Sequence, residues 1–262
     1  MPVERIVDAA DPRLAPYRDL CDAGLAARSG LFVAEGRPLV RRLLAAARFR
    51  AHSVLTTEAM LDGLRDVADG VPVYVVDEAT IRSVVGFHFH RGCLALGERG
   101  VPGTAEALLA GRRVVVLERV TNPDNVGAVF RNAAAFGADC VLLSPGCGDP
   151  LYRRSVRVSM GGVLRVAFAT LSGWPSGLAR LRAHGFTVVA LTPDGDVPLD
   201  LFCEARPSGK PVAILLGSEG DGLSTSARAE ADVCISIPMA PGDHSLNVAV
   251  ACAIGLHRLA PA

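Results

Sequence analysis

The chain has 262 residues, half of them hydrophobic, and its 27 basic side chains balance 27 acidic ones. This length and composition predict a folded protein of one large or two modest domains, and the zero net charge does not by itself indicate a nucleic-acid binder. Residues 1–22 mix arginines, acids and prolines, and no apolar run reaches the roughly 18 residues of a membrane span, so we expect neither a signal peptide nor a membrane protein.

Seven cysteines are spread along the chain, an odd number that includes no Cys-x-x-Cys pair. Several of them lie inside apolar stretches typical of strands or helices, where a thiol packs as a small hydrophobic group. This pattern predicts reduced thiols in a cytoplasmic protein.

Residues 1–98 are predicted to form a first domain of alternating helices and strands. Apolar residues recur at helical spacing over 38–49, directly after a segment that ends in Gly36, and they predict an amphipathic helix. Short β-type runs follow at 53–56, 71–76 and 93–96. Glycines and a proline then mark a linker, which we place at residues 99–111.

Arginine supplies 26 of the 27 basic side chains, and six arginines lie between residues 28 and 50 beside the single acid Glu35. Because arginine forks onto phosphates and stacks on bases, a local patch that includes Arg37 and Arg41 could bind RNA despite the zero net charge. The alternative is a solvated helix face with no partner.

Two histidines and a thiol, His88, His90 and Cys93, lie within six residues. Strand alternation would place both histidines on one face, but the sequence offers no fourth ligand for a tetrahedral zinc site. We therefore predict no metal.

Strands and helices alternate more plainly over residues 112–262, the second predicted domain. Apolar runs predict strands at 114–117, 140–143, 165–170, 186–191, 212–216 and 234–237. Helices are predicted from about residue 126 to Gly137, over 175–184 and over 245–259. Continuously apolar strands that alternate with helices predict an α/β fold with a mostly parallel sheet, which binds ligands at the carboxyl ends of its strands.

The first loop of interest follows the strand at 114–117. Asn125 stands near the start of the next helix, where capping a free backbone N–H is the simpler role. Arg131 is six residues further, about 9 Å along the helix axis, and helical side chains lean towards the N-terminus. Its guanidinium could therefore hold a phosphate at the mouth of the helix.

The second loop follows the strand at 212–216 and contains Gly217, Gly220 and Gly222. Glycines let the backbone approach a ligand closely and adopt positive φ angles, although this spacing is not the G-x-G-x-x-G of a dinucleotide site. Glu219 could be a turn residue, or a carboxylate that faces Arg131 and fixes its orientation.

The third loop leads from the strand at 234–237 into the final helix. Ser245 could be the N-cap of that helix, and Asn247 a polar residue in its first turn. Taken singly, these are the simpler readings, but three such loops in series are not a requirement of packing.

Together the loops resemble the SpoU/TrmH group of the SPOUT superfamily, the RNA 2′-O-ribose methyltransferases. The resemblance depends on three motifs in the family's order and approximate spacing: Asn125-x-Gly127-x-x-x-Arg131, Gly217-x-Glu219-Gly220-x-Gly222, and Ile237-Pro238-Met239 with Ser245-Leu246-Asn247-Val248. It implies an α/β trefoil-knot domain, a homodimer packed through that domain, and S-adenosylmethionine bound in the knot loops.

The resemblance also implies roles for individual residues. The implied catalytic residues are Asn125, Arg131, Glu219, Ser245 and Asn247. The implied cofactor contacts, made largely through backbone groups, are Gly217, Ile237, Met239 and Leu246. Because a guanidinium stays protonated, we expect Arg131 to align a substrate phosphate and polarise the 2′-hydroxyl, and not to act as a literal base.

The first domain more loosely resembles the L30e-like α/β substrate-binding domain of many members, through residues 32–36 and 90–95. With this resemblance, a second run of arginines after residue 151 becomes a candidate RNA contact, although a charged helix start is the alternative. The predicted RNA-binding residues are Arg37, Arg41, Arg153, Arg154 and Arg157.

A domain arrangement of this kind resembles members that act on ribosomal RNA more than the compact transfer-RNA enzymes, so rRNA is the expected substrate. Two other functions stay open, a tRNA 2′-O-methyltransferase and a catalytically silent RNA-binding or ribosome assembly factor. A nucleotide-dependent oxidoreductase would leave the second and third motifs unexplained.

Overall fold

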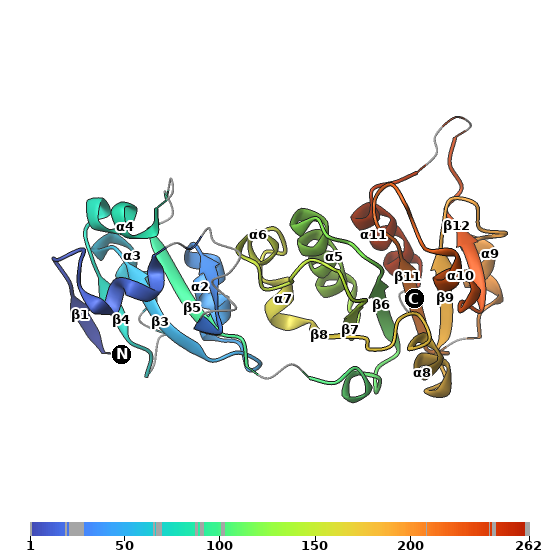
Figure 1. The fold of residues 1–262 in the computed structure, drawn as a ribbon, viewed down its shortest axis with the longest axis horizontal. Helices are drawn as coiled ribbons and strands as arrows, with labels where there is room; N and C mark the ends of the chain where they lie inside the picture. Colours follow the sequence, from blue (N-terminus) through green and yellow to red (C-terminus); the bar gives the residue numbers. More distant parts are fainter. Residues whose placement is uncertain are drawn as a thin grey trace. The chain divides into compact units, whose positions relative to one another are not determined.

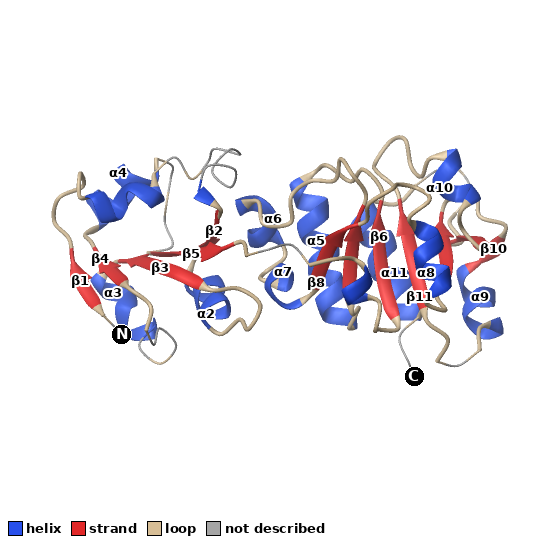
Figure 2. Ribbon diagram, turned by 60° about the horizontal axis from the view of Figure 1, so that its bottom comes forward, coloured by secondary structure: helices blue, strands red, loops and turns tan. Residues whose placement is uncertain are grey.

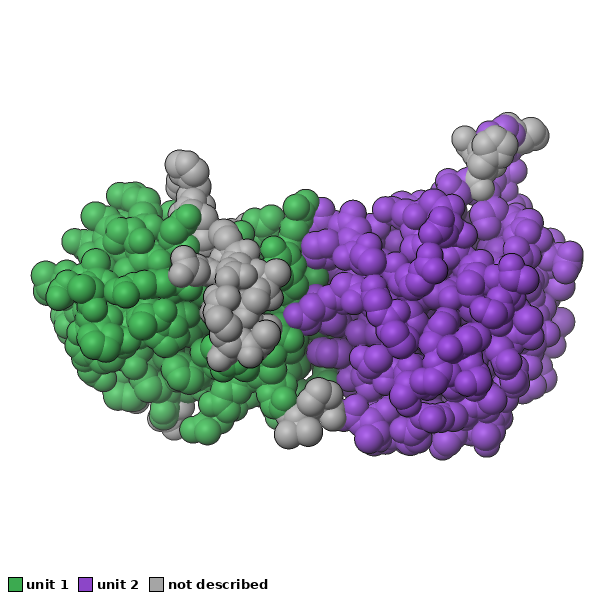
Figure 3. All heavy atoms as spheres, viewed as in Figure 1, with its two compact units in different colours: residues 1–101, 151–165 green, residues 102–150, 166–262 purple. Residues whose placement is uncertain are grey.

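A computed structural model of the chain shows two compact units (Figure 3). The structure describes residues 2–18, 20, 29–64, 66, 70–86, 89, 92–100, 103–207, 209–240, 242 and 245–259. The first unit consists of residues 1–101 and 151–165, and the second of residues 102–150 and 166–262. This division differs from the prediction at two places. Residues 151–165 group with the first unit although the sequence assigned them to the second domain, and most of the predicted linker at 99–111 belongs to the second unit, where Ala105 and Leu109 join the core.

The first unit contains a five-stranded mixed sheet in the order β1-β4-β3-β5-β2 (Figure 1). The strands are β1 (Val3–Arg5), β2 (Leu31–Glu35), β3 (Ala51–Thr56), β4 (Val73–Val75) and β5 (Cys93–Glu98). β1, β4 and β3 are parallel, whereas β5 is antiparallel to both β3 and β2. The helices are η1 (Pro12–Tyr17), α2 (Arg37–Leu44), α3 (Glu58–Leu61), η2 (Asp62–Leu64), α4 (Glu78–Val85), α6 (Arg153–Val158) and α7 (Gly162–Arg165).

Helix α2 is shorter than the predicted helix over 38–49. Its buried face consists of Leu39, Val40 and Leu43, as the apolar spacing predicted. The helix ends at Leu44, and Phe49 reaches the core from the following turn, where it packs edge-on against Phe32 with ring centroids 5.1 Å apart. The sequence pattern predicted one helix through residue 49, and the last five residues of that prediction lie outside α2.

Helix α6 packs against β2 and explains why residues 151–165 join the first unit. Arg153, the first residue of α6, places its guanidinium 3.0 Å from the carboxylate of Glu35, which is buried at the end of β2. Arg165 closes α7, so the next strand begins at Ala167 and not at the predicted residue 165.

The second unit contains a seven-stranded sheet in the order β10-β12-β9-β11-β6-β7-β8, and every neighbouring pair is parallel. The strands are β6 (Arg113–Leu117), β7 (Cys140–Leu143), β8 (Ala167–Thr170), β9 (Thr187–Leu191), β10 (Val197–Pro198), β11 (Val212–Leu216) and β12 (Val233–Ser236). The helices are η3 (Glu106–Leu108), α5 (Pro123–Phe136), α8 (Leu178–Ala183), α9 (Leu199–Ala205), α10 (Thr225–Ala229) and α11 (Val248–Arg258). The predicted α/β fold with a parallel sheet is confirmed.

Helices cover both faces of this sheet (Figure 2). Because successive strand residues point to opposite faces, Val114 and Val116 of β6 share one core cluster with Leu178 of α8 and Ala227 of α10. On the opposite face, α5 and α11 pack side by side, with α11 against β11 (Figure 1). All carboxyl ends of the parallel strands lie along one edge, so the loops that follow them gather there.

Of the helices that the structure describes, none combines the length and the apolar character needed to cross a membrane.

Candidate functional site

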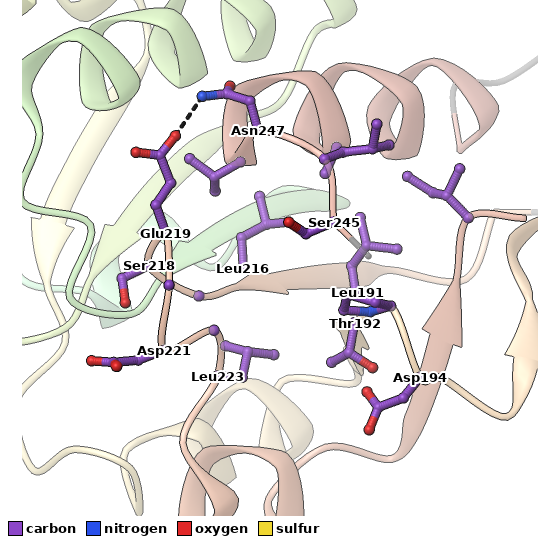
Figure 4. A pocket seen from close by; sticks show the side chains of 18 of the residues that line it. Leu191, Thr192, Asp194, Leu216, Ser218, Glu219, Asp221, Leu223, Ser245 and Asn247 are labelled. Carbon is purple, nitrogen blue, oxygen red and sulfur yellow. Dashed lines mark hydrogen bonds between the residues drawn. The ribbon is translucent and has the colours of Figure 1, made fainter. Parts of the chain in front are cut away.

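A pocket of about 620 Å³ lies at the carboxyl edge of the sheet in the second unit (Figure 4). Three segments and Arg228 of α10 line it: residues 191–194 at the end of β9, residues 216–223 at the end of β11, and a C-terminal group that follows β12. The C-terminal group consists of Ile237, Met239, Ser245, Leu246, Asn247, Val248 and Ala251. Two of the three loops singled out in the sequence therefore meet in one cavity.

The glycine-rich loop, defined here as Gly217–Leu223, folds back on itself beside the pocket. A Cβ atom at Gly217 would lie 2.1 Å from the carbonyl carbon of Gly222, so no side chain fits at this position. The N–H of Gly222 donates to the carbonyl oxygen of Ser218 at 3.0 Å, and Gly220 has a φ of +91°. Glycine is needed at 217 for a close approach of the backbone and at 220 for a left-handed conformation.

Asn247 connects the glycine-rich loop to helix α5. Its side-chain Nδ2 donates to Oε1 of Glu219 at 2.6 Å and to Oδ1 of Asn125 at 2.9 Å. Figure 4 shows Asn247 and Glu219 pointing toward one another at one end of the pocket. Three residues from three separate motifs thus form one hydrogen-bonded cluster.

Asn247 is also the N-cap of α11, because its Oδ1 accepts from the N–H of Ala249 at 2.9 Å. The expectation that the final helix begins at Ser245 is wrong, since the helix begins at Val248. Ser245 instead lies in the loop and lines the pocket. Both residues are good caps by type, and only the contacts of Asn247 across the fold distinguish them.

Asn125 does not cap α5, contrary to the simpler reading of the sequence. The N-cap is Asn122, whose side chain accepts from the N–H of Asp124, and Asn125 is the third residue of the helix. Asn125 is only 6% exposed, and its oxygen accepts from Asn247. A buried asparagine inside a helix with a partner 122 residues away has a tertiary role and not a local one.

Arg131 occupies an exposed position on α5 and does not line the pocket. The expected pairing of Glu219 with Arg131 is not formed among the described residues, because Glu219 accepts from Asn247 instead. The adjacent Asn132 donates to the carbonyl oxygen of Ala249 at 2.7 Å, which joins α5 to the first turn of α11. Arg131 is therefore accessible from solvent and separate from the hydrogen-bonded cluster around Asn247.

The remaining residues predicted for cofactor binding all line the pocket. These residues are Gly217, Ile237, Met239 and Leu246. The pocket thus contains every predicted cofactor contact and three of the five predicted catalytic residues, while Asn125 joins it through Asn247 and Arg131 stands apart.

The loop after β9 also contributes Thr192 and Asp194 to the pocket, and neither residue was predicted from the sequence. Asp194 pairs with Arg228 of α10 at 3.0 Å, and the pKa of the Asp194 carboxyl is lowered, first by the Thr192 hydroxyl and then by the Arg228 guanidinium. A Cβ at Gly195 would lie 2.3 Å from the backbone of Ile235, so this loop also needs a glycine. The signal was the run Thr-Pro-Asp-Gly at the carboxyl end of an apolar strand.

The arginines predicted to bind RNA lie in the first unit, and Arg41 and Arg153 form ion pairs there. Arg41 pairs with Asp66 at 2.5 Å and donates to the carbonyl oxygen of Gly63, and Arg153 pairs with Glu35. Arg37 and Arg154 occupy exposed positions, and Arg157 is half-buried.

Two residues of the rejected metal site, His88 and His90, lie outside the described residues. Within the part of the chain that is described, no group of three or more His, Cys, Asp or Glu side chains is placed to hold a metal ion.

Known proteins resemble this chain in sequence and in structure. The sequence model of the SpoU rRNA Methylase family matches residues 112–257, more than half of the chain. A Mycobacterium bovis protein named uncharacterized tRNA/rRNA methyltransferase is 40% identical over 263 residues, which cover 98% of this chain and 91% of that protein. The crystal structure of an AdoMet-bound rRNA methyltransferase from Sinorhizobium meliloti has a TM-score of 0.82 at 25% identity, covering 98% of this chain and 97% of that one. A crystal structure described as an RNA 2′-O ribose methyltransferase has a TM-score of 0.77 at 26% identity, covering 98% of each chain.

Proposed function

We propose that this chain, an RNA methyltransferase that belongs to the SpoU rRNA methylase family, transfers the methyl group of S-adenosylmethionine to a ribose 2′-hydroxyl of ribosomal RNA. The observation that carries the proposal is the hydrogen-bonded cluster of Asn125, Glu219 and Asn247 at one end of the pocket. Packing requires no such cluster, and it joins residues from all three family motifs.

The pocket fits S-adenosylmethionine in size and in chemistry. Its volume of about 620 Å³ lies within the range of small-molecule sites, roughly 300–1,000 Å³. Leu216, Ile237 and Leu246 offer an apolar wall for a planar base, and Gly217 lets the backbone come close to the ligand. The carboxylates of Asp194 and Glu219 suit the cationic groups of the cofactor.

When bound, S-adenosylmethionine supplies an electrophilic methyl group on a positively charged sulfur. The protein must then place the 2′-oxygen in line with that methyl group and accommodate the leaving proton, and positioning alone can supply much of the acceleration. In our proposal Asn247 and Glu219 shape the reacting end of the pocket, while exposed Arg131 binds the phosphate beside the target ribose. The Arg131 guanidinium stays protonated and polarises the hydroxyl.

We further propose that the enzyme is a cytoplasmic homodimer that packs through the second unit. Leu246, just before α11, and Val250, in its first turn, are 38% and 47% exposed, although both are large hydrophobic residues. Contiguous exposed apolar surface marks an interaction site, and in our proposal these two side chains contribute to the face that a second copy covers. The arginines of the first unit, with its L30e-like character, would add contacts to the RNA backbone.

The proposal is tested by mapping 2′-O-methylated nucleotides in RNA from cells with and without the gene. We expect one rRNA position to lose its methyl group in the deletion strain and to regain it with the wild-type gene, but not with an Arg131→Lys variant. Loss of a tRNA methyl group would instead support the tRNA alternative. If every 2′-O-methyl group persisted and the purified protein bound no S-adenosylmethionine, the chain would be an RNA-binding or assembly factor.

A further inference from the structure

Glu118 is a buried carboxylate just outside the pocket, and its role is not explained by the proposed reaction. It directly follows β6 and is only 3% exposed. Its Oε1 accepts from the indole N–H of Trp174 at 2.8 Å and from the hydroxyl of Ser224 at 2.7 Å. Its Oε2 accepts from the backbone N–H of Ser224 at 2.8 Å.

These bonds join Glu118 to both ends of the glycine-rich loop. The backbone N–H of Glu118 donates to the carbonyl oxygen of Leu216, the residue before Gly217, at 2.8 Å. Its carboxylate holds Ser224, the residue after Leu223, through two bonds. One residue therefore fixes where the loop begins and where it ends.

Ser224 also connects Glu118 to helix α10, which borders the pocket. It is the N-cap of α10, because its hydroxyl oxygen accepts from the N–H of Ala227 at 3.1 Å. Helix α10 carries Arg228, which lines the pocket and pairs with Asp194 of the loop after β9. The orientation of two pocket loops thus depends on the position of Ser224.

A carboxylate suits this position better than any neutral group. Three donors converge on two oxygens, and an amide could accept at only one of them while its NH₂ group would face a donor. A charge buried in the fold is costly unless it is fully hydrogen-bonded. An apolar side chain would leave all three donors without an acceptor, so the carboxylate at Glu118 is what holds Ser224 and Trp174 in place.

We propose that Glu118 is a positioning residue that holds the glycine-rich loop, through Ser224, in the conformation that binds the cofactor. The inference rests on the proposed function, because that proposal identifies S-adenosylmethionine as the ligand. Trp174 is the one tryptophan of the chain, so its fluorescence emission reports whether the indole N–H is still hydrogen-bonded to the Glu118 carboxylate.

The experiment measures the dissociation constant for S-adenosylmethionine by calorimetry, together with the Trp174 emission maximum and thermal stability. Glu118→Gln should raise the dissociation constant by about tenfold, the equivalent of one lost hydrogen bond to a charged group. It should also shift the Trp174 emission. Ser224→Ala should raise the dissociation constant less, because its backbone N–H still reaches Oε2, and should leave the emission unchanged.

Two controls separate positioning from stability. Asp139→Asn alters a carboxylate that accepts from the backbone N–H groups of Arg112 and Arg113, at the opposite end of the strand that Glu118 follows. It should lower the melting temperature and leave the dissociation constant unchanged. Trp174→Phe removes the indole bond but keeps both bonds to Ser224, so the dissociation constant should stay within about twofold of the wild type.

The outcomes separate this inference from the proposed function. If the wild type binds S-adenosylmethionine and both Glu118→Gln and Ser224→Ala bind it equally well, the positioning role is overturned and the proposed function stands. If the wild type does not bind the cofactor, the proposed function fails and this inference fails with it. If Glu118→Gln does not fold, Ser224→Ala decides alone, since it leaves the buried carboxylate in place.

Discussion

The pocket loops of the second unit and the arginines of the first unit were both predicted from sequence, yet they are built in opposite ways. The pocket is shaped by backbone that allows no side chain at Gly217 and by the hydrogen bonds from Asn247 to the buried Asn125 and to the exposed Glu219. Among the arginines, Arg41 and Arg153 pair with protein carboxylates, whereas Arg37 occupies an exposed position. Backbone geometry determines the pocket loops, whereas the choice of surface side chains determines the arginine-rich region.

This difference teaches that a cofactor site is specified by positions that tolerate no other residue. A surface that binds RNA is specified by the arginine side chains that solvent and substrate can reach. Each substitution in the pocket loops should therefore have a large and localised effect on the cofactor or on the methyl transfer. Substitutions among the arginines should divide into those that destabilise the fold and those that weaken RNA binding. The predictions below run from the largest expected effect to the smallest.

Gly217→Ala should weaken cofactor binding more than any other substitution considered. The new Cβ would lie 2.1 Å from the carbonyl carbon of Gly222, so the glycine-rich loop must move away from the pocket. We expect the dissociation constant for S-adenosylmethionine to rise by more than about 100-fold, since overpacking of this kind costs up to roughly 3 kcal/mol or more. Calorimetry measures the effect.

Gly103→Ala is the matched control for that substitution. Nothing lies within 4 Å of the position that its Cβ would occupy, so the same chemical change should leave cofactor affinity unchanged. Equal affinity in the Gly217→Ala variant and the wild type would show that the glycine-rich loop does not contact the cofactor.

Arg131→Lys should lower the turnover number by about 100-fold, a typical cost of losing one group that stabilises a transition state. Lysine keeps the charge but loses the planar fork that aligns a phosphate. Because Arg131 does not line the pocket, the dissociation constant for the cofactor should not change. Near-normal turnover of the variant with its RNA substrate would contradict the geometric role of the guanidinium.

Asn247→Asp should lower the turnover number by about tenfold, equivalent to about 1.4 kcal/mol and comparable with the loss of one or two hydrogen bonds. Aspartate keeps the oxygen that caps α11 but cannot donate to Glu219 or Asn125, and it places a second negative charge beside Glu219. Steady-state kinetics at saturating cofactor measures the change. A variant with lost thermal stability and unaltered turnover would assign Asn247 to the helix cap alone.

Arg153→Ala should destabilise the first unit by about 1–3 kcal/mol, because it removes the ion-pair partner of the buried Glu35. Thermal or denaturant unfolding tests this directly. A double variant that also carries Glu35→Gln should recover part of the lost unfolding free energy, because a neutral glutamine at position 35 does not need the positive charge of Arg153. An unfolding free energy equal to that of the wild type would show that the pair contributes nothing.

Arg157→Ala supplies the contrast within the same helix and should have the smallest effect. We expect RNA affinity to fall by a few-fold and its salt dependence to weaken by roughly one phosphate contact. Thermal stability should not change. If Arg157→Ala destabilised the fold and left RNA binding unaltered, Arg153 and Arg157 would share a structural role.

The sequence predicted the second unit best where the residues are buried on both sides. The strands at 140–143 and 212–216 match β7 and β11, because a continuous apolar run in a parallel sheet leaves no other placement. The start of the last helix was misplaced, since Ser245 and Asn247 are both good caps and only the bonds from Asn247 to Asn125 and Glu219 settle the choice.

Non-local contacts account for the other differences. The loop after β9 was overlooked because Thr192 and Asp194 have the composition of an ordinary turn, and only the parallel order of the strands brings them beside the glycine-rich loop. Likewise, the ion pair of Arg153 with Glu35 joins residues 118 positions apart, so the arginine looked available from its local sequence. The sequence motifs were sufficient to identify the pocket. The partners of individual side chains could be found only in the three-dimensional structure.

A crystal structure of the chain soaked with S-adenosylmethionine is the most direct test of the central claim. Our account predicts cofactor density between the glycine-rich loop, the loop after β9 and the segment from Ile237 to Leu246, with the methyl group directed toward Asn247 and Glu219. Density at any other place in the molecule, or a methyl group at the opposite end of the pocket near Asp194, would contradict it.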